Sequence, residues 1–364
     1  MLHAVIMAGG TGTRFWPESR ALRPKQLLNM LGQQTMIQST VDRLGDLVPP
    51  ERVLVATTAP LAEAIAAQLP QLPGSAILVE PCKRDTAPCV GLAATWLLRA
   101  DPDATMVMMP SDHVIADGEA FRAAIRYAAG LVEERPERIV TFGIRPTYPA
   151  EIFGYIERSD SLGPSSPSYL QPPTYRVKQF CEKPKAAVAV GYLEQGTFYW
   201  NSGIFVWKAR TIMEALARFE PDMYARLAQI GAAIDTPAYP AVLEREFAAI
   251  RAVSIDYAVL EHATDVVVVE ASFPWDDVGS WRALGRLGGA DDQGNTISAR
   301  HLGLQTRGTI VRSTDPEHVV VTLGLTDCIV VHTSDATLVA NKHDEEAIRQ
   351  VVKLLEERGW REYL

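Results

Sequence analysis

The chain has 364 residues, of which 47% are hydrophobic and 22% are charged, and its formal net charge is −9. This is the composition of an ordinary globular protein that is long enough for one large domain and one small one. The acidic balance argues against a nucleic-acid or membrane partner, because both attract basic surfaces. Positive charge for any phosphate ligand must therefore be concentrated locally.

The N-terminus lacks the charged region and the length of a secretory signal, and no apolar run approaches the roughly 18 residues of a membrane-spanning helix. The four cysteines form no C-x-x-C pair, which argues against a disulfide framework and a structural zinc site. We therefore expect a soluble, cytoplasmic protein whose thiols are reduced.

Short apolar runs alternate with helical patterns through the first half of the chain. The runs that we predict to be strands are His3–Met7, Arg52–Thr58, Ala76–Glu80, Thr105–Met109 and Arg138–Gly143. Their nearly continuous apolar character is typical of strands that are covered on both faces. The βαβα order predicts an α/β fold with a doubly wound, mostly parallel, Rossmann-like sheet, whose ligands bind beyond the carboxyl ends of the strands.

A glycine-rich loop follows the first predicted strand. Residues 8–17 read Ala-Gly-Gly-Thr-Gly-Thr-Arg-Phe-Trp-Pro, and Pro-Lys-Gln follows at residues 24–26. Consecutive glycines let backbone N–H groups approach a phosphate, and the two cations Arg14 and Lys25 suit a triphosphate. A merely structural glycine turn is the alternative. The third glycine of a dinucleotide fingerprint is absent, because Phe15 stands in its place, and this disfavours a dehydrogenase.

Two groups of acidic residues follow predicted strands further along the chain. Asp112 comes after the strand Thr105–Met109, and Asp276 and Asp277 come after the apolar run Val266–Val269. Carboxylates at strand ends can meet and hold Mg²⁺ together with phosphate oxygens and water. Each acid could instead be a cap or turn former. Adjacent residues usually point apart, so Asp276 and Asp277 are not both expected to be ligands.

A third motif, Glu182-Lys183-Pro184, ends the predicted strand Arg176–Glu182. Lys183 is a candidate for binding the phosphate of a sugar phosphate, and Glu182 for binding sugar hydroxyls. A surface Glu–Lys turn would also explain the sequence. Gly154 and Asn201 lie in stretches that mix aromatic, amide and glycine residues, as carbohydrate pockets often do, and we assign both to the same site.

The C-terminal part of the chain reads as short β segments followed by an amphipathic helix. The segments are Gly308–Arg312, His318–Leu323, Cys328–His332 and Ala336–Ala340. They show no clean repeat period. We predict a large catalytic domain at residues 1–287 and a small β-rich domain at residues 288–364.

Together these motifs resemble the mannose-1-phosphate guanylyltransferases, a family of sugar nucleotidyltransferases. The matching pieces are Gly9-Gly10-x-Gly12-x-Arg14-Phe15-Trp16-Pro17, Pro24-Lys25-Gln26, Glu80-Pro81 with Arg84-Asp85-Thr86-Ala87-Pro88, Pro110-Ser111-Asp112-His113, Phe153-Gly154-Tyr155, Glu182-Lys183-Pro184, Trp200-Asn201-Ser202-Gly203 and Trp275-x-Asp277-Val278-Gly279-Ser280-Trp281. They span almost the whole predicted catalytic region in the expected order.

The resemblance implies transfer of GMP from GTP to mannose 1-phosphate, with pyrophosphate released and Mg²⁺ or another divalent cation as cofactor. It also implies that the predicted catalytic domain is a nucleotidyltransferase domain, and that the C-terminal domain is a left-handed β-helix that helps to form a homodimer. It implies a metal pair at Asp112 and Asp277, and Lys183 on the sugar phosphate with Gly154, Glu182 and Asn201. Arg14, Lys25, Asp112 and Lys183 are the expected catalytic residues. The expected nucleotide-binding residues are Ala8, Gly9, Gly10, Gly12, Thr13, Arg14, Lys25, Glu80, Thr86, Ala87 and Ser111.

Glu80 is our candidate for base selection, because one carboxylate can accept hydrogen bonds from both N1–H and N2–H₂ of guanine. A readout by backbone groups alone is the alternative. Two further functions compete with the main one: the same reaction with glucose 1-phosphate and dTTP or UTP, and a non-catalytic sugar-nucleotide sensor. The sensor reading predicts loss of a metal-binding acid or a phosphate-binding cation, and the sequence retains both.

Overall fold

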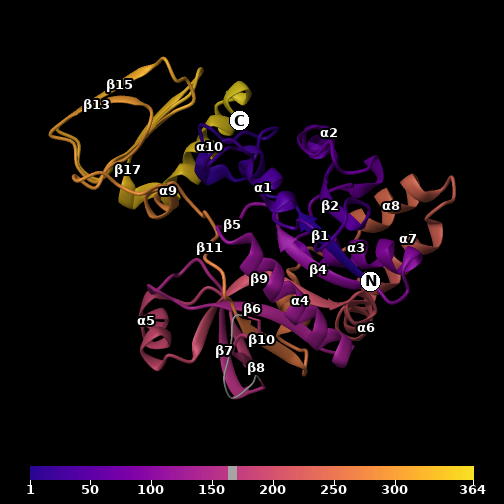
Figure 1. Ribbon diagram of the computed structural model, residues 1–364. Coiled ribbons are helices and arrows are strands. Elements are labelled where there is room, and N and C mark those ends of the chain that lie inside the picture. Colours follow the sequence, from indigo (N-terminus) through magenta and orange to yellow (C-terminus); the bar gives the residue numbers. More distant parts are fainter. Residues whose placement is uncertain (163–169) are drawn as a thin grey trace. The chain divides into compact units, whose positions relative to one another are not determined.

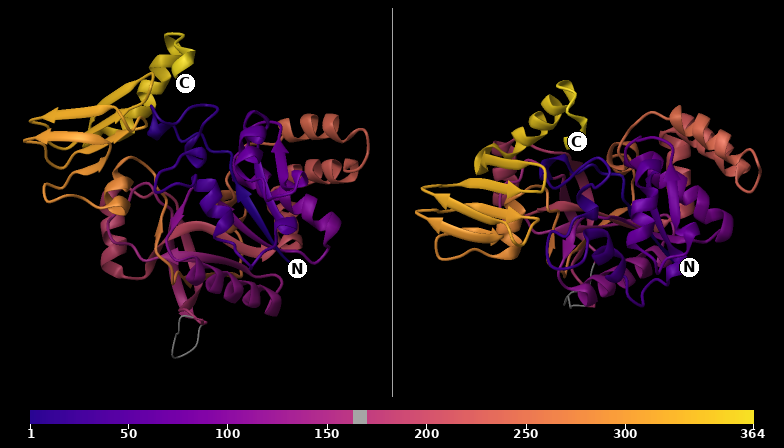
Figure 2. Two further views of the ribbon diagram at one scale, coloured as in Figure 1. Left: turned by 45° about the horizontal axis from the view of Figure 1, so that its top comes forward. Right: turned by 90° about the horizontal axis from the view of Figure 1, so that it is seen from above.

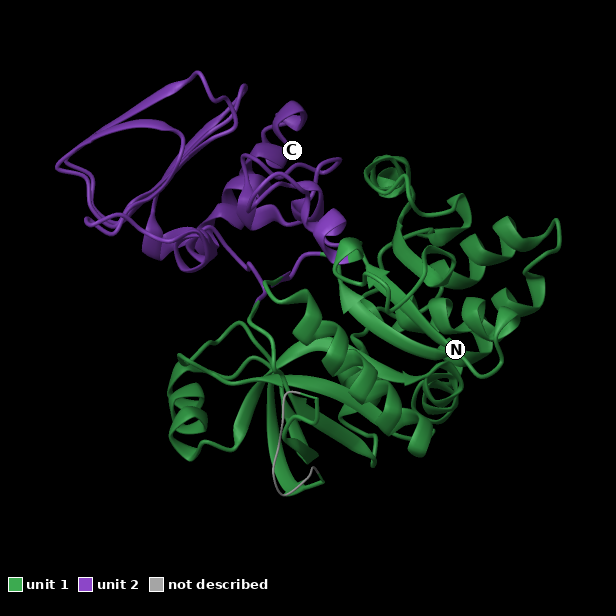
Figure 3. Cartoon of the chain, viewed as in Figure 1, with its two compact units in different colours: residues 1–9, 41–111, 115–275 green, residues 10–40, 112–114, 276–364 purple. Residues whose placement is uncertain are grey.

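The computed structural model describes residues 1–162 and 170–364 (Figure 1). The chain forms two compact units, which Figure 3 shows in different colours. Unit 1 consists of Met1–Gly9, Val41–Ser111 and Ile115–Trp275, and unit 2 consists of Gly10–Thr40, Asp112–Val114 and Asp276–Leu364. Both units are thus discontinuous in sequence. The expected domain boundary after residue 287 stays a prediction.

Unit 1 is built on a 9-stranded sheet. In spatial order the strands are β3 (Ile77–Glu80), β2 (Val53–Thr58), β1 (Leu2–Met7), β4 (Thr105–Pro110), β9 (Phe198–Lys208), β6 (Ile139–Ile144), β10 (Val266–Glu270), β8 (Thr174–Cys181) and β7 (Tyr155–Ser161). β8 and β9 run opposite to the other strands. The mostly parallel, Rossmann-like sheet predicted from the sequence is therefore confirmed.

Helices cover the sheet and supply most of the core of unit 1. They are α2 (Ala59–Gln68), α3 (Thr86–Ala100), α4 (Gly118–Glu134), α5 (Ala186–Gln195), α6 (Ala209–Phe219), α7 (Pro221–Ala233) and α8 (Tyr239–Ala248), with a π-helical turn at Asp256–Leu260. The largest core cluster joins α3, α6 and α7 to alternate residues of the strands, such as Met106 and Met108 on β4. Every residue of β2 is buried, as expected for a strand with both faces covered.

Unit 2 joins the glycine-rich loop segment to the C-terminal part of the chain. Its elements are the 3₁₀ turns η1 (Thr13–Phe15), η2 (Lys25–Leu27), η6 (Lys342–Ala347) and η7 (Arg361–Tyr363), the helices α9 (Arg282–Gly288) and α10 (Ile348–Glu357), and strands β12 (Thr296–Ser298), β13 (Arg300–Leu304), β14 (Ile310–Ser313), β15 (Val319–Leu323), β16 (Cys328–His332) and β17 (Thr337–Asn341). Helix α1 (Met36–Asp42) and strands β5 (Val114–Ile115) and β11 (Trp275–Asp276) include residues of both units.

A hydrophobic cluster links the loop segment of unit 2 to its C-terminal part. Phe15 and Trp16 from the loop segment share it with Trp281, with Ile329 of β16 and with Ile348 of α10. A buried ion pair adds to it: both carboxylate oxygens of Glu18 bind the guanidinium of Arg312, at 2.6 and 2.8 Å. The loop that follows the first strand is therefore supported by side chains that lie about 300 residues further along the chain.

Four β strands of unit 2 lie in parallel pairs with a spacing of 19 residues, namely β13 with β15 and β14 with β16, whereas β12 pairs with β14 at a spacing of 14 residues and β17 runs antiparallel to β16. Arg300 pairs with Val319, Arg307 with Thr326, and Ile310 with Ile329. The same spacing relates the corners, because positive φ angles recur at residues 305 and 324 and again at residues 308 and 327. Figure 2 shows the strands side by side in orange. This β-rich, coiled arrangement confirms the predicted fold class of the C-terminal part, and its handedness stays a prediction.

No helix in the described part of the chain has the length and apolar character needed to cross a membrane.

Candidate functional site

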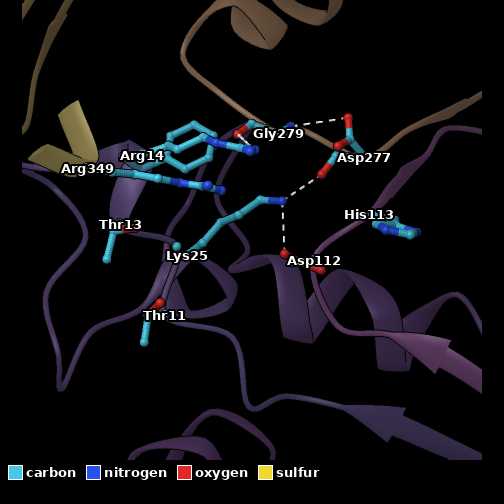
Figure 4. A pocket seen from close by; sticks show the side chains of 11 residues that line it. Thr11, Thr13, Arg14, Lys25, Asp112, His113, Asp277, Gly279 and Arg349 are labelled. Carbon is cyan, nitrogen blue, oxygen red and sulfur yellow. Dashed lines mark hydrogen bonds and ion pairs between the residues drawn. The ribbon is translucent and has the colours of Figure 1, made fainter. Parts of the chain in front are cut away.

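A cavity of about 350 Å³ in unit 2 collects most of the phosphate-binding and metal-binding candidates. It is lined by Thr11, Gly12, Thr13, Arg14, Phe15, Lys25, Asp112, His113, Asp277, Gly279 and Arg349. Figure 4 shows the cations Arg14, Lys25 and Arg349 pointing into the same space as the carboxylates of Asp112 and Asp277. The cavity thus combines residues from several separate stretches of the sequence.

Gly12 allows the loop to close over Lys25. Its backbone is left-handed, with φ 60° and ψ 29°. A Cβ at this position would overlap the Cβ of Lys25 and would lie 2.8 Å from the Lys25 backbone nitrogen. A residue with a side chain would therefore be strained and would also push η2 away. By contrast, nothing lies within 4 Å of the place where a Cβ on Gly10 would stand.

Lys25 connects the two acidic segments of the cavity. Its side chain is only 7% exposed. Its Nζ donates to Asp112 Oδ2 at 2.9 Å and to the backbone oxygen of Asp277 at 2.6 Å. Burial alone would raise the pKa of Asp112, but attraction to Lys25 and His113 outweighs burial and leaves that pKa below its ordinary value. Asp112 is therefore a carboxylate at neutral pH.

The neighbouring acids Asp276 and Asp277 have different partners. Asp276 binds the guanidinium of Arg286 with both carboxylate oxygens, at 2.9 and 3.0 Å. Asp277 lines the cavity and accepts from the backbone N–H of Gly279 at 3.2 Å. Burial raises the pKa of Asp277 to about 6, although Lys25 opposes the shift. The geometry thus leaves Asp277, rather than Asp276, available to a ligand in the cavity.

Asp112 and Asp277 fit the donor set of a magnesium ion that also binds phosphate. Mg²⁺ takes one or two carboxylates and completes its shell with phosphate oxygens and water. Among the described residues, no group of three or more His, Cys, Asp or Glu side chains is arranged to hold a metal on its own. A divalent ion at these two acids would therefore depend on oxygens from the substrates.

Glu80 lies in unit 1 at the end of β3, apart in sequence from the cavity residues. It is buried, and its Oε2 lies 3.7 Å from the place where a Cβ on Gly9 would stand. Burial raises the pKa of Glu80 to about 7, and a hydrogen bond with Cys89 of α3 opposes that shift. A buried carboxyl group with a pKa near neutrality is typical of functional sites.

The other nucleotide-binding candidates of unit 1 are positioned by their backbones. The N–H of Ala8 donates to Ala56, and the N–H of Ser111 donates to Met7. Thr86 and Ala87 begin α3 and bind the segment before the π-helical turn: the hydroxyl of Thr86 accepts from the N–H of Ile255 at 2.8 Å, and the N–H of Ala87 donates to Val253.

The four sugar-phosphate candidates come together in unit 1. Asn201, on β9, donates its backbone N–H to the oxygen of Gly154 at 2.8 Å. A Cβ on Gly154 would lie 2.6 Å from Glu182 Oε2, so glycine leaves the space that this carboxylate occupies. Lys183, whose side chain is 64% exposed, donates to Glu182 Oε1 at 2.5 Å, and this bond raises the lysine pKa.

Asp256 joins this group, although its sequence pattern did not predict a role in the site. Its Oδ1 accepts from Asn201 Nδ2 at 3.0 Å, while Asn201 Oδ1 accepts from the N–H of Gly203. Burial, followed by repulsion from Glu182, raises the pKa of Asp256 to about 6. The available signal was an acid directly before an apolar helical run, which is too common a pattern to single out.

The structure therefore gathers the predicted residues into separate groups. Gly12, Thr13, Arg14, Lys25, Asp112 and Asp277 line the cavity of unit 2, and Gly10 belongs to the same loop. Gly154, Glu182, Lys183 and Asn201 meet in unit 1, where Ala8, Gly9, Glu80, Thr86, Ala87 and Ser111 also lie. Arg349 lines the cavity and was not predicted, because it comes from the C-terminal helix, where the pattern showed only an apolar face.

Comparisons with known proteins agree with this architecture. The family model described as nucleotidyl transferase matches residues 3–292, and a model described as MannoseP isomerase/GMP-like beta-helix domain matches residues 299–355. The chain is 37% identical over 366 residues to a mannose-1-phosphate guanylyltransferase of Klebsiella pneumoniae, covering 100% of this chain and 76% of that protein. It is 36% identical over 358 residues to the xanthan biosynthesis protein XanB of Xanthomonas campestris strain B100, covering 98% and 73%.

A solved structure is similar over nearly the whole chain. It is a crystal structure from Thermus thermophilus, described as a mannose-1-phosphate geranyltransferase, with 36% sequence identity and a TM-score of 0.85. The match covers 98% of this chain and 99% of that one.

Proposed function

The chain belongs to the mannose-1-phosphate guanylyltransferases, and on that basis we propose that it transfers GMP from GTP to α-D-mannose 1-phosphate, giving GDP-mannose and pyrophosphate. The observation that supports this most directly is the meeting of Arg14, Lys25, Asp112 and Asp277 around one cavity. Nucleotidyl transfer needs such a place, because two anionic substrates repel each other.

The reaction is an in-line displacement at phosphorus. A phosphate oxygen of mannose 1-phosphate attacks the α-phosphorus of GTP, the bond from that phosphorus to the bridging oxygen breaks, and pyrophosphate leaves with the bonding electrons. No protein nucleophile is needed. Arg14 and Lys25 bind the triphosphate and offset its charge, while Lys183 does the same for the phosphate of the sugar.

The cofactor in this proposal is Mg²⁺ or another divalent cation held by Asp112 and Asp277. When bound, it neutralises charge on the phosphate oxygens. Lys25 has a second task here, because its hydrogen bonds to Asp112 and to the backbone of Asp277 fix both segments. Lys25 therefore links the acidic ligands to the triphosphate-binding loop.

Substrate selection is assigned to unit 1. The ionised Glu80 carboxylate accepts from N1–H and N2–H₂ of guanine, and Thr86 and Ala87 position the end of α3 beside it. On the sugar side, Glu182 and Asn201 bind hydroxyl groups. Gly154 is needed because a larger residue would displace Glu182. Asp256, through its bond to Asn201, fixes the direction of that amide.

We further propose a cytoplasmic homodimer. Strands β13 and β15 expose a row of apolar side chains, namely Leu302, Leu304, Val319, Val321 and Leu323. Covering such a row with a second copy would remove apolar surface from water. The four free cysteines suit a reducing compartment.

The experiment that tests the reaction measures pyrophosphate release with GTP, dTTP, UTP and ATP, each against mannose 1-phosphate and glucose 1-phosphate. We expect the pair of GTP and mannose 1-phosphate to give the highest kcat/KM. A preference for dTTP or UTP with glucose 1-phosphate would keep the reaction but reject the proposed substrates. Binding of GTP without turnover in Mg²⁺ would instead indicate a sensor.

A further inference from the structure

Arg349 is a cation in the phosphate cavity that the proposed mechanism does not use. It is the second residue of α10, and it lines the cavity beside Arg14 and Lys25. Figure 4 shows Arg349 reaching toward the same space as Arg14. Its side chain is 52% exposed, and the ion pair that it makes within the described residues is a long one, 4.0 Å from Nη1 to Glu346 Oε2. Its guanidinium is therefore accessible to a ligand.

The two cations expected from the sequence are already engaged by protein groups. Arg14 donates through Nη1 to the oxygen of Gly279 at 3.0 Å, and its Nε lies 3.1 Å from a carboxylate oxygen of Glu346. Lys25 donates to Asp112 and to the backbone of Asp277. Much of the donor capacity of Arg14 and Lys25 thus serves to hold the site together.

The charge balance of the cavity also favours a further cation. Without Arg349, the positive charges of Arg14 and Lys25 stand against the carboxylates of Asp112, Asp277 and Glu346. Three carboxylates against two cations leave a negative balance, which repels a polyphosphate before a metal arrives, and Arg349 brings the two signs level. Arg349 adds positive charge, and its planar fork can bind phosphate oxygens through two parallel hydrogen bonds.

The fold places Arg349 in the cavity. Its neighbour Ile348 is 2% exposed and packs in the cluster that includes Phe15 and Trp281. Val351, Val352 and Leu355, also on α10, pack against that cluster. Anchored in this way, α10 presents residue 349 beside Arg14 rather than leaving it on a freely moving tail.

We propose that Arg349 binds the β- and γ-phosphates of the nucleotide, and hence the leaving pyrophosphate, so that the C-terminal region completes the phosphate site. This inference rests on the proposed function for the identity of the nucleotide, but the polyphosphate chemistry stands without it. It gives α10 a direct part in substrate binding in addition to any part in assembly.

The test is calorimetric titration of the full chain with inorganic tripolyphosphate, with GTP and with GMP. The variants are Arg349→Ala, Arg349→Lys and, as a charge-matched control one turn further along α10, Lys353→Ala. We expect Arg349→Ala to weaken binding of tripolyphosphate and GTP about tenfold at low ionic strength, and less in high salt, because the guanidinium is half exposed. Arg349→Lys should recover part of the loss. GMP, which lacks the β- and γ-phosphates, should bind all variants equally.

The base-free probe separates this inference from the proposed function. If GTP is not the preferred nucleotide, tripolyphosphate still tests Arg349. The assignment would be overturned if Arg349→Ala bound tripolyphosphate as tightly as the unaltered chain, or if Lys353→Ala lost as much affinity as Arg349→Ala. It would also be overturned if Arg349→Ala lost as much affinity for GMP as for tripolyphosphate, or if the unaltered chain did not bind tripolyphosphate. Because residue 349 is exposed, thermal unfolding of Arg349→Ala should match that of Lys353→Ala, and a marked difference would indicate a structural role instead.

Discussion

Replacing Glu80 by glutamine should remove the pH dependence of guanine nucleotide binding. The pKa of Glu80 is raised to about 7 by burial, from an ordinary value of 4.5. About one tenth of the molecules then carry the carboxylate at pH 6, about half at pH 7 and about nine tenths at pH 8. If only the carboxylate accepts from guanine, GTP should bind up to about tenfold more weakly at pH 6 than at pH 8.

The variant Glu80→Gln cannot ionise and presents an NH₂ group that opposes the guanine donors. We expect kcat/KM for GTP at pH 8 to fall by about 10- to 100-fold, the scale of a lost hydrogen bond to a charged group. ITP, which lacks the N2 amino group, should lose less. The matched control is Glu63→Gln on α2, which should leave both the rate and its pH profile unchanged.

Stability provides a second measurement that does not depend on nucleotide. The pKa of Glu80 is higher in the folded chain than in the unfolded chain, so the folded chain binds more protons between about pH 4.5 and pH 7. As the pH rises through that window, Glu80 therefore lowers the free energy of unfolding. Across this window, Glu80 should lower the free energy of unfolding by on the order of 3 kcal/mol. In urea unfolding, Glu80→Gln should not show this dependence on pH. If Glu80→Gln and Glu63→Gln show the same pH profiles for GTP binding and for unfolding, Glu80 has neither the raised pKa nor the role in guanine binding.

Four further substitutions test the cavity of unit 2 and its support. Lys25→Ala and Asp112→Ala should each lower kcat by at least about 10²-fold in a pyrophosphate-release assay, and near-normal turnover in a folded variant would remove that residue from its role. Gly12→Ala should lower the free energy of unfolding by about 1–3 kcal/mol, since its Cβ would meet the backbone of Lys25; an unchanged urea midpoint would contradict this. Arg312→Ala leaves the Glu18 carboxylate buried without its partner, so it should lower the free energy of unfolding by about 3–5 kcal/mol in the same urea assay. Replacing both residues by apolar ones should lower it clearly less.

The sheet and the strand ends could be predicted because they depend on local patterns. Continuous apolar runs identified β2 and β4; the structure shortens the first by one residue and lengthens the second by one. The position of Asp112 directly after such a run likewise followed from the chain order. These signals are contained in short windows of sequence.

The 19-residue coil of the C-terminal strands was missed for a physical reason. Its corners need positive φ, and glycine provides this at residues 308 and 324, but Gln305 and Asp327 occupy the equivalent corners. The repeat is therefore kept in backbone conformation rather than in residue type. The short strands β12 and β13 are largely exposed and lacked an apolar run to identify them.

Long-range contacts explain the other omissions. Nothing in the sequence near Arg14 indicates that Glu346 and Arg349 lie beside it, because the contact depends on how Ile348 packs with Phe15. Asp276 and Asp277 could not be separated by their local pattern either. The ion pair between Asp276 and Arg286 is what distinguishes their surroundings.

The proposed transfer of GMP to mannose 1-phosphate is tested most simply by identifying the products that the chain forms from GTP, mannose 1-phosphate and Mg²⁺. We expect GDP-mannose and pyrophosphate to form in equal amounts, and neither to form when mannose 1-phosphate is left out. No GDP-mannose from the folded chain under these conditions, or faster turnover of glucose 1-phosphate with dTTP or UTP, would contradict it.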